Sequence, residues 1–142
     1  RFDPILFNNI AWLNLLKFTD DSLKIADKMS FKATEINSTI SQFLGTRAGV
    51  LISLGKYSEG VALLEGYVKP NKPVDRETNT IIGFLFLGFA YCQLSNKEKA
   101  VEYITVLLEN QDQLDADDRI LYEKLCTNFE DFNNMCHTIN NH

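Results

Sequence analysis

The chain has 142 residues, of which 45% are hydrophobic and 23% charged, and its formal net charge is −5 at pH 7. This composition is typical of a globular protein, and a chain of this length can bury roughly two thirds of the surface that it exposes when unfolded. The acidic excess would repel a phosphate backbone unless basic groups were gathered on one face, and the sequence shows no such cluster. We therefore expect one domain over residues 1–142 that binds no nucleic acid.

The cysteines and the apolar segments bear on the protein's location. Cys92, Cys126 and Cys136 form no C-x-x-C pair, and an odd number cannot all pair within one chain, so we expect reduced thiols and a cytoplasmic protein. The most apolar segment, residues 80–94, is shorter than the roughly 20 residues that span a bilayer, and it predicts a buried helix without membrane insertion. No signal peptide pattern is present, but the chain opens on Arg1, so an upstream signal could be missing.

The first predicted helix pair covers residues 4–36. Asp3 has the side chain of an N-cap, and Pro4 suits the first helical position because its fixed φ is helical and its missing N–H is not needed there. Thr19 and Asp20 start a second helix, which we expect to run antiparallel to the first.

Two more pairs and a last helix follow. The second pair covers residues 38–68, with Asn37 or Ser38 as its cap and a left-handed Gly55 between its helices. Pro70 and Pro73 then interrupt the helical pattern, since proline disfavours helix at and before its position.

The third pair covers residues 77–110. It turns at Ser95 and Asn96, where asparagine tolerates left-handed geometry. A last helix is predicted over residues 115–137, with an apolar stripe of Leu121, Leu125, Phe129, Phe132 and Cys136. No segment alternates with period two, so the predicted class is all-α.

The second and third pairs repeat each other at a step of 40 residues. Large residues meet large ones and small residues meet small ones when the sequence is shifted by that step. The pattern resembles the tetratricopeptide repeat (TPR) family, and its signature places in the third pair are held by Phe84, Leu87, Gly88, Tyr91, Ala100 and Ile104. The same places in the second pair are held by Leu44, Ala48, Leu51, Gly60, Leu64 and Tyr67, and a looser copy has Phe7, Ile10, Ala11, Ser22, Ala26 and Met29.

The resemblance implies a right-handed superhelical array of antiparallel helix pairs, a TPR-like α-solenoid, closed by a C-terminal capping helix. Small residues at Gly60 and Ala100 would let the two helices of a pair cross closely, while Gly66 has no assigned role. The chain departs from the family in its step of 40 residues, where about 34 is usual, and in Arg47, where leucine is usual.

The resemblance also implies a concave groove lined by the first helix of each pair. Carried over to this chain, its partner-binding residues are Asn8, Trp12, Leu15, Gln42, Gly49, Ile52, Ile82, Leu85, Phe89 and Cys92. The groove is mostly apolar, and the lysine, asparagine and arginine set with which some members hold the carboxylate of chaperone tails is essentially absent. The sequence is equally consistent with Trp12 as a binding hot spot and with Trp12 as a core residue.

The helix over residues 77–94 is apolar on nearly every face and must be covered all round. On the groove side, its cover is an amphipathic helix or extended segment of a partner, a second copy of the chain, or the chain's own last helix folded back. These alternatives remain open at the level of sequence.

No residue set points to catalysis or to a bound metal. Cys136, His137 and His142 lack the further ligands of a metal site, and residues 109–118 lack the glycine and closing glutamate of a calcium loop. The predicted function is therefore a non-catalytic protein–protein interaction scaffold without cofactors, whose partner is a protein or peptide. The alternatives are a homodimerisation module, and a regulatory domain of a larger protein, with or without attachment to a membrane.

Overall fold

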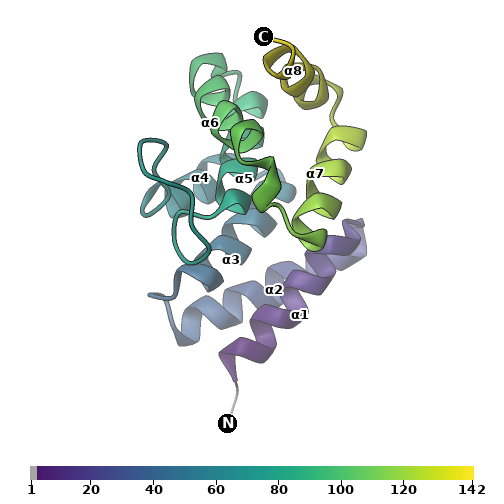
Figure 1. Ribbon diagram of the computed structural model, residues 1–142. Helices are drawn as coiled ribbons and strands as arrows, with labels where there is room; N and C mark the ends of the chain where they lie inside the picture. The colour runs from purple at the N-terminus through teal and green to yellow at the C-terminus, as the bar shows by residue number, and fades with distance from the viewer. Residues whose placement is uncertain (1–2) are drawn as a thin grey trace. The chain divides into compact units, whose positions relative to one another are not determined.

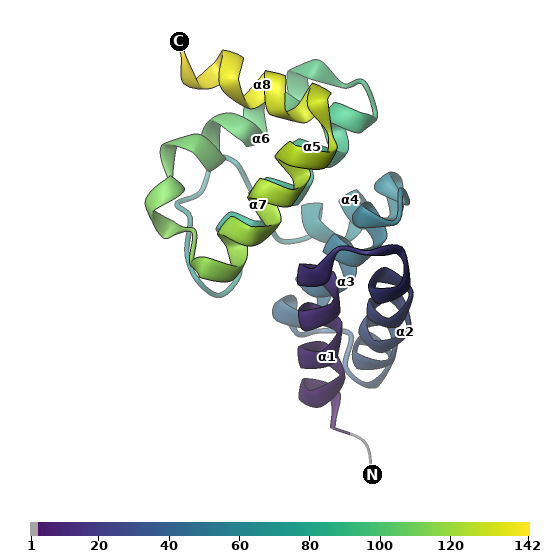
Figure 2. The ribbon, with the colours of Figure 1, turned by 90° about the vertical axis from the view of Figure 1, so that its right-hand side faces the viewer.

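The computed structural model describes residues 3–142, whose regular elements are all helical (Figures 1 and 2). Eight α-helices and one 3-10 turn lie within these residues, and none of them forms a strand, which confirms the all-α class. The helices divide after Tyr67 into two compact units, and each unit is described by itself below.

The first unit holds four helices: α1 (Pro4–Lys17), α2 (Asp20–Ile36), α3 (Ser41–Ser53) and α4 (Tyr57–Glu65). Each helix packs against the next, and α1 also packs against α3; Figure 2 shows α1 beside α2. The predicted starts of the first pair are confirmed, because Asp3 Oδ1 accepts a hydrogen bond from the Ile5 amide at 2.9 Å, and Thr19 forms a capping box with Ser22.

The predicted cap at Asn37 or Ser38 is wrong, since α3 begins three residues later, at Ser41. Asn37 instead ends α2: its backbone N–H donates to the Ala33 carbonyl at 3.1 Å, and its side-chain oxygen accepts from the Thr39 amide. A side chain engaged with its own turn in this way favours non-helical backbone. The prediction for Gly55 is confirmed, with φ at +87°.

The close crossing of α3 and α4 at Gly60 is confirmed. A Cβ atom on Gly60 would lie 2.5 Å from Ile52 Cγ1 and 2.9 Å from the Ala48 carbonyl oxygen. In the second unit the equivalent crossing is made at Gly88, where a Cβ would lie 2.7 Å from Ile104 Cγ1. Glycine lowers the helix propensity in both pairs. It is present because the close crossing of the two helices leaves no room for a side chain.

The second unit contains α5 (Ile81–Gln93), α6 (Lys97–Glu109), the 3-10 turn (Gln111–Gln113), α7 (Ala116–Asn128) and α8 (Glu130–Asn140). α5 packs against α6, α7 and α8. In the turn before α6 the left-handed residue is Ser95, with φ at +60°, and Asn96 is the N-cap that accepts from the Lys99 amide. The prediction assigned the left-handed conformation to asparagine, which here serves as the cap instead.

The predicted start of α5 near residue 77 is four residues too early. Asp75 Oδ1 accepts hydrogen bonds from the amides of Glu77, Thr78 and Asn79, which holds these residues in a turn. Asn79 is buried and bridges the loop, because its side chain accepts from the Lys69 amide and donates to the Lys69, Lys72 and Pro73 carbonyls.

The predicted capping helix over residues 115–137 is two helices. Phe129, between α7 and α8, has extended backbone with φ at −131° and ψ at 97°, and no side chain caps the start of α8. The stripe that we predicted from helical periodicity is therefore shared by two helices that pack against each other. Local sequence did not reveal the break because neither proline nor glycine marks it.

Candidate functional site

The first six predicted groove residues lie in the first unit, on two helices that pack together. Leu15 and Gly49 are buried, and Ile52 is buried where its side chain faces Gly60, in the crossing of α3 and α4. Trp12 is half-buried, and Gln42 is exposed. Asn8 is buried, and its Oδ1 has no hydrogen-bond partner among the described residues.

The other four predicted groove residues lie on α5, in the second unit. Leu85 and Phe89 are fully buried, while Ile82 and Cys92 are half-buried. The Phe89 ring makes edge contacts with Phe129, at 4.7 Å between ring centroids, and with Phe132, at 5.4 Å. Three ways of covering this helix were left open by the sequence. In the structure, residues from the C-terminal part of the same chain cover Phe89.

An apolar face of α1 was not anticipated from the sequence. Ile5, Leu6 and Leu13 are 58%, 55% and 59% exposed, and we call these three residues the α1 face. Leu13 follows Leu6 by seven residues, and Trp12 follows Ile5 by seven, so the four side chains share one side of the helix. The opposite side holds the buried residues Asn8, Ala11 and Leu15, so α1 is apolar on both sides.

The sequence signal for the α1 face was present but ambiguous. α1 carries no charged side chain between Pro4 and Leu16, as α5 carries none between Ile81 and Gln93. A helix that is apolar all round is expected to be buried all round. α5 follows this rule, whereas α1, which also carries Asn8, Asn9 and Asn14, is exposed on one side.

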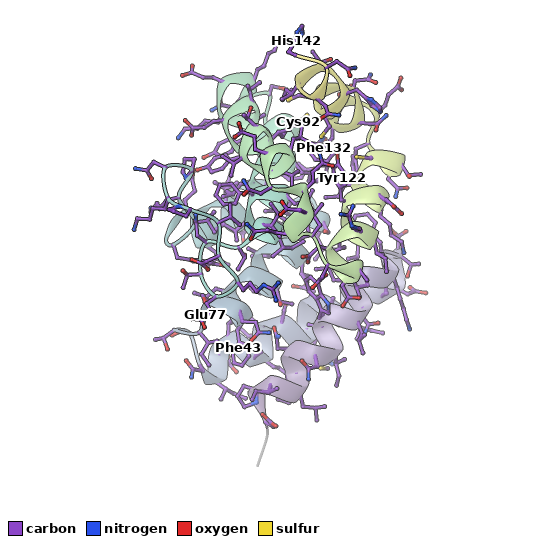
Figure 3. All side chains as sticks on the ribbon, in the orientation of Figure 1. Phe43, Glu77, Cys92, Tyr122, Phe132 and His142 are labelled. Carbon is purple, nitrogen blue, oxygen red and sulfur yellow. The ribbon has the colours of Figure 1, made fainter. Side chains whose placement is uncertain are left out.

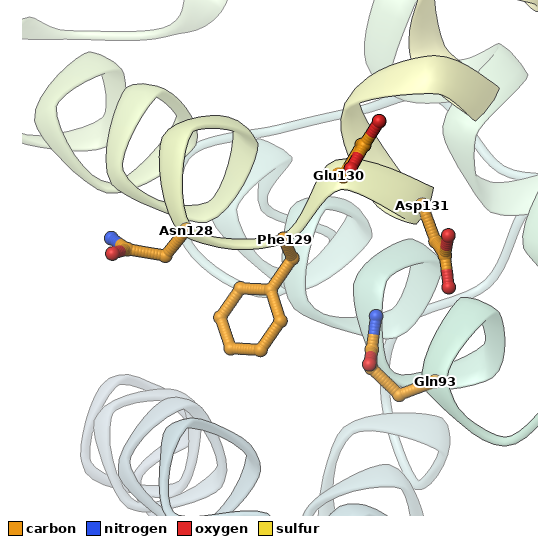
Figure 4. Close-up of a pocket in the computed structure, with 5 residues that line it drawn as sticks. All are labelled: Gln93, Asn128, Phe129, Glu130 and Asp131. Carbon is orange, nitrogen blue, oxygen red and sulfur yellow. The ribbon is translucent and has the colours of Figure 1, made fainter.

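A shallow pocket of about 210 Å³ lies where α7 meets α8, lined by Gln93, Asn128, Phe129, Glu130 and Asp131 (Figure 4). It is smaller than the roughly 300 to 1,000 Å³ of typical small-molecule sites, and its lining is mainly polar. Burial raises the pKa of the neighbouring Cys92 thiol, and the charge of Asp131 adds to this effect. The pocket therefore offers no enclosed apolar volume for a ligand.

No group of three His, Cys, Asp or Glu side chains among residues 3–142 is placed to hold a metal ion. None of the described helices has the length and apolar character needed to cross a membrane. The chain matches no protein-family model, and comparisons with curated proteins and with solved structures give no significant match.

Proposed function

We propose that the protein is a non-catalytic protein-binding module, built as a right-handed array of TPR-like helix pairs, and that the α1 face binds an amphipathic helix of a partner protein. The observation that carries the proposal is the exposure of Ile5, Leu6 and Leu13, each more than half accessible on one side of one helix. Apolar side chains that gather in water on one side of a helix are typical of interaction sites.

The packing of the pairs supports the TPR-like part of the proposal. α3 crosses α4 at Gly60, and α5 crosses α6 at Gly88, two of the small-residue places that the family pattern requires. The first helix of each pair packs on the second, as expected for helical hairpins.

The chemistry of the α1 face indicates the type of partner. No charged side chain interrupts α1 between its two ends, so the face can desolvate without burying an unpaired charge. An amphipathic helix would place apolar residues at three- and four-residue spacing against Leu6 and Leu13. Trp12, half-buried beside this face, would supply aromatic area at its edge.

The proposal is tested by comparing partners recovered by the wild-type protein, Leu13→Glu and Ile25→Glu. Ile25 is an exposed apolar residue of α2 in the same unit, so its variant introduces the same charge on a different helix. We expect Leu13→Glu to lose a partner that the other two proteins retain, and the purified partner to show at least a tenfold weaker affinity for Leu13→Glu.

Three results would overturn the proposal. Equal binding of the purified partner by all three proteins would exclude the α1 face. Recovery of only further copies of this chain, with a dimer in light scattering that Leu13→Glu dissolves, would favour the homodimerisation alternative. A turnover abolished by changing a single polar residue would show that the protein is an enzyme.

A further inference from the structure

Asn37 ends α2 and opens the link of residues 37–40 that joins this helix to α3 (Figure 1). Its backbone is extended, with φ at −146° and ψ at 106°. The link ends shortly before the buried Phe43, whose side chain is labelled in Figure 3. Asn37 is half-buried, whereas Ser38 and Thr39 are exposed. Asn37 therefore lies outside regular helix, beside two residues that are open to water.

The side-chain oxygen of Asn37 is held by two donors from one residue. Thr39 donates to Asn37 Oδ1 from its backbone amide at 3.1 Å and from its hydroxyl at 2.8 Å. Among residues 3–142, neither Asn37 Nδ2 nor the Ser38 amide makes a hydrogen bond. The Asn37 side chain thus combines an oxygen polarised by two donors with an unengaged nitrogen, and the next amide along the chain is unengaged as well.

We propose that Asn37 is a site of spontaneous covalent modification, where the Ser38 amide nitrogen converts the asparagine into aspartate and isoaspartate by way of a cyclic imide. Asparagine is among the thermolabile residues of proteins. The two Thr39 donors accelerate the reaction, because the attack places negative charge on Oδ1 and both donors already lie within hydrogen-bond distance of that atom. Donors placed in advance need no reorganisation as the charge develops.

The reaction has two steps. The Ser38 nitrogen attacks Asn37 Cγ: the new N–C bond forms, the bond from Cγ to Nδ2 breaks, and Nδ2 leaves as ammonia with the proton of the Ser38 amide. Water then adds to one of the two imide carbonyls and opens the ring. Opening at Cγ gives aspartate, and opening at the main-chain carbonyl gives isoaspartate. In total, asparagine and water give an acid and ammonia, with no change of oxidation state.

Comparison with other asparagines shows what is special about Asn37. It is the one asparagine of the chain that is followed by serine, and none is followed by glycine, so its neighbouring amide is the least shielded by a side chain. Asn79 is buried, and its Nδ2 donates to three carbonyls, which holds the leaving group in place. The amide that follows Asn128 is committed to a helical hydrogen bond at 3.0 Å. Asn96 Oδ1 accepts from the Lys99 amide at 3.2 Å, and a lysine follows it in the chain.

The modification changes the joint between the first two helix pairs. The formal net charge of the chain goes from −5 to −6, since a neutral amide becomes a carboxylate. The new charge lies at the C-terminus of α2, where the helix dipole is also negative. The isoaspartate form in addition lengthens the main chain by one carbon atom within the short link to α3.

The test is incubation of the purified protein at 37 °C and at pH 6, 7.5 and 9, followed by tryptic peptide mapping. Trypsin places Asn37 in the peptide of residues 33–47, and Asn79 and Asn96 in the peptide of residues 77–97. We expect the first peptide to gain about one mass unit and to separate into aspartate and isoaspartate forms. The conversion should be faster at higher pH, because the attacking nitrogen must lose its proton, and at least tenfold slower in the second peptide.

Variants assign the roles of the neighbouring residues. Thr39→Val removes the hydroxyl donor and should slow the conversion at least fivefold, whereas Thr39→Ser keeps that donor and should react as the wild-type protein does. Ser38→Ile should slow it at least tenfold, because a branched side chain shields the attacking amide. The control is Thr78→Val, which removes a hydroxyl bond to Asp75 in the second unit and should leave the rate at Asn37 unchanged. Far-UV circular dichroism identifies any variant that fails to fold.

Three results would overturn the proposal. A peptide of residues 33–47 that keeps its mass at every pH would show that the site is inert. Aspartate formed without isoaspartate would indicate direct hydrolysis by water instead of attack by the Ser38 amide. Equal rates in the wild-type protein and in Thr39→Val would show that the Thr39 hydroxyl does not assist the reaction at Oδ1.

Discussion

Arg47 on α3 reaches across to α2 and donates hydrogen bonds from one guanidinium nitrogen to both the carboxylate and the backbone carbonyl of Asp27. The same nitrogen donates to Ser30 Oγ at 3.1 Å, and the guanidinium lies over the Phe31 ring at 5.5 Å from its centroid. Arginine stands here where the repeat pattern has leucine, and its contacts join the first helix pair to the second.

Arg47→Ala is therefore expected to destabilise the first unit. The Asp27 carboxylate is partly exposed, which limits the ionic contribution, but the bonds to the carbonyl and to Ser30 are more buried. We expect a loss of about 1 to 2 kcal/mol in the free energy of unfolding, measured by urea titration. The control is Arg119→Ala, which removes an exposed arginine with a single bond to the Gln111 carbonyl. An equal loss in both variants would contradict the role of Arg47.

The two glycines of α4 and its C-terminus should respond in opposite directions to alanine. Gly60→Ala would force its Cβ against Ile52 and against the backbone of Ala48, and we expect a cost of about 1 to 3 kcal/mol despite the better helix propensity of alanine. Gly66→Ala meets nothing closer than 3.4 Å, and the helical φ of −64° suits alanine, so a gain of about 0.4 to 1 kcal/mol is expected. Thermal or urea unfolding of the two variants tests the difference, and matching signs would refute it.

The aromatic cluster over α5 should be strongly coupled. Phe89→Ala removes a fully buried ring, with an expected cost of about 3 to 5 kcal/mol. Combining it with Phe129→Ala in a double-mutant cycle should give an interaction energy of about 0.5 to 1.5 kcal/mol, because the two rings touch. Ile120→Ala, at an exposed position of α7, is the control and should be nearly neutral. Strictly additive losses for Phe89 and Phe129 would show that the C-terminal helices do not cover α5 in solution.

Asp118 should make the stability depend on pH. Burial raises the pKa of Asp118 from 3.8 to about 6. The hydrogen bond from the Asp115 backbone lowers this pKa, whereas the charges of Asp115 and Asp117 raise it further. Between these two pH values the folded protein holds a proton that the unfolded chain releases, so the contribution of Asp118 to stability increases as the pH falls from about 7 towards 4.

The measurement is the urea midpoint of the wild-type protein and of Asp118→Asn at pH 7.5, 6.5 and 5.5. The asparagine keeps an acceptor for the Asp115 amide but does not titrate. We expect the advantage of the asparagine variant to shrink as the pH falls, and a constant difference would count against the raised pKa. Comparing the two proteins cancels the other carboxyls, among them Asp75, whose pKa is lowered by backbone hydrogen bonds.

The sequence predicted the helices well where local chemistry decides their ends. Asp3 and Thr19 cap their helices and Gly55 is left-handed, as predicted, because a helix cap needs only the neighbouring backbone. The start of α5 and the break at Phe129 were missed. The first depends on the side-chain bonds of Asp75, and the second on aromatic packing that no local pattern encodes.

The candidate site was less accessible to sequence reasoning. The sequence did not show that one side of α1 would stay exposed, because α1, like α5, carries no charged side chain between its ends.

The α1 face also has a consequence for the handling of the isolated protein. Like-charge repulsion keeps molecules with a net charge of −5 apart at neutral pH, but the isoelectric point lies near 5.0, where that repulsion vanishes. Acidification would therefore remove the colloidal barrier while Ile5, Leu6 and Leu13 remain in water. Solubility should fall steeply as the pH approaches 5, and a single glutamate at position 13 should restore much of it by placing charge where molecules adhere.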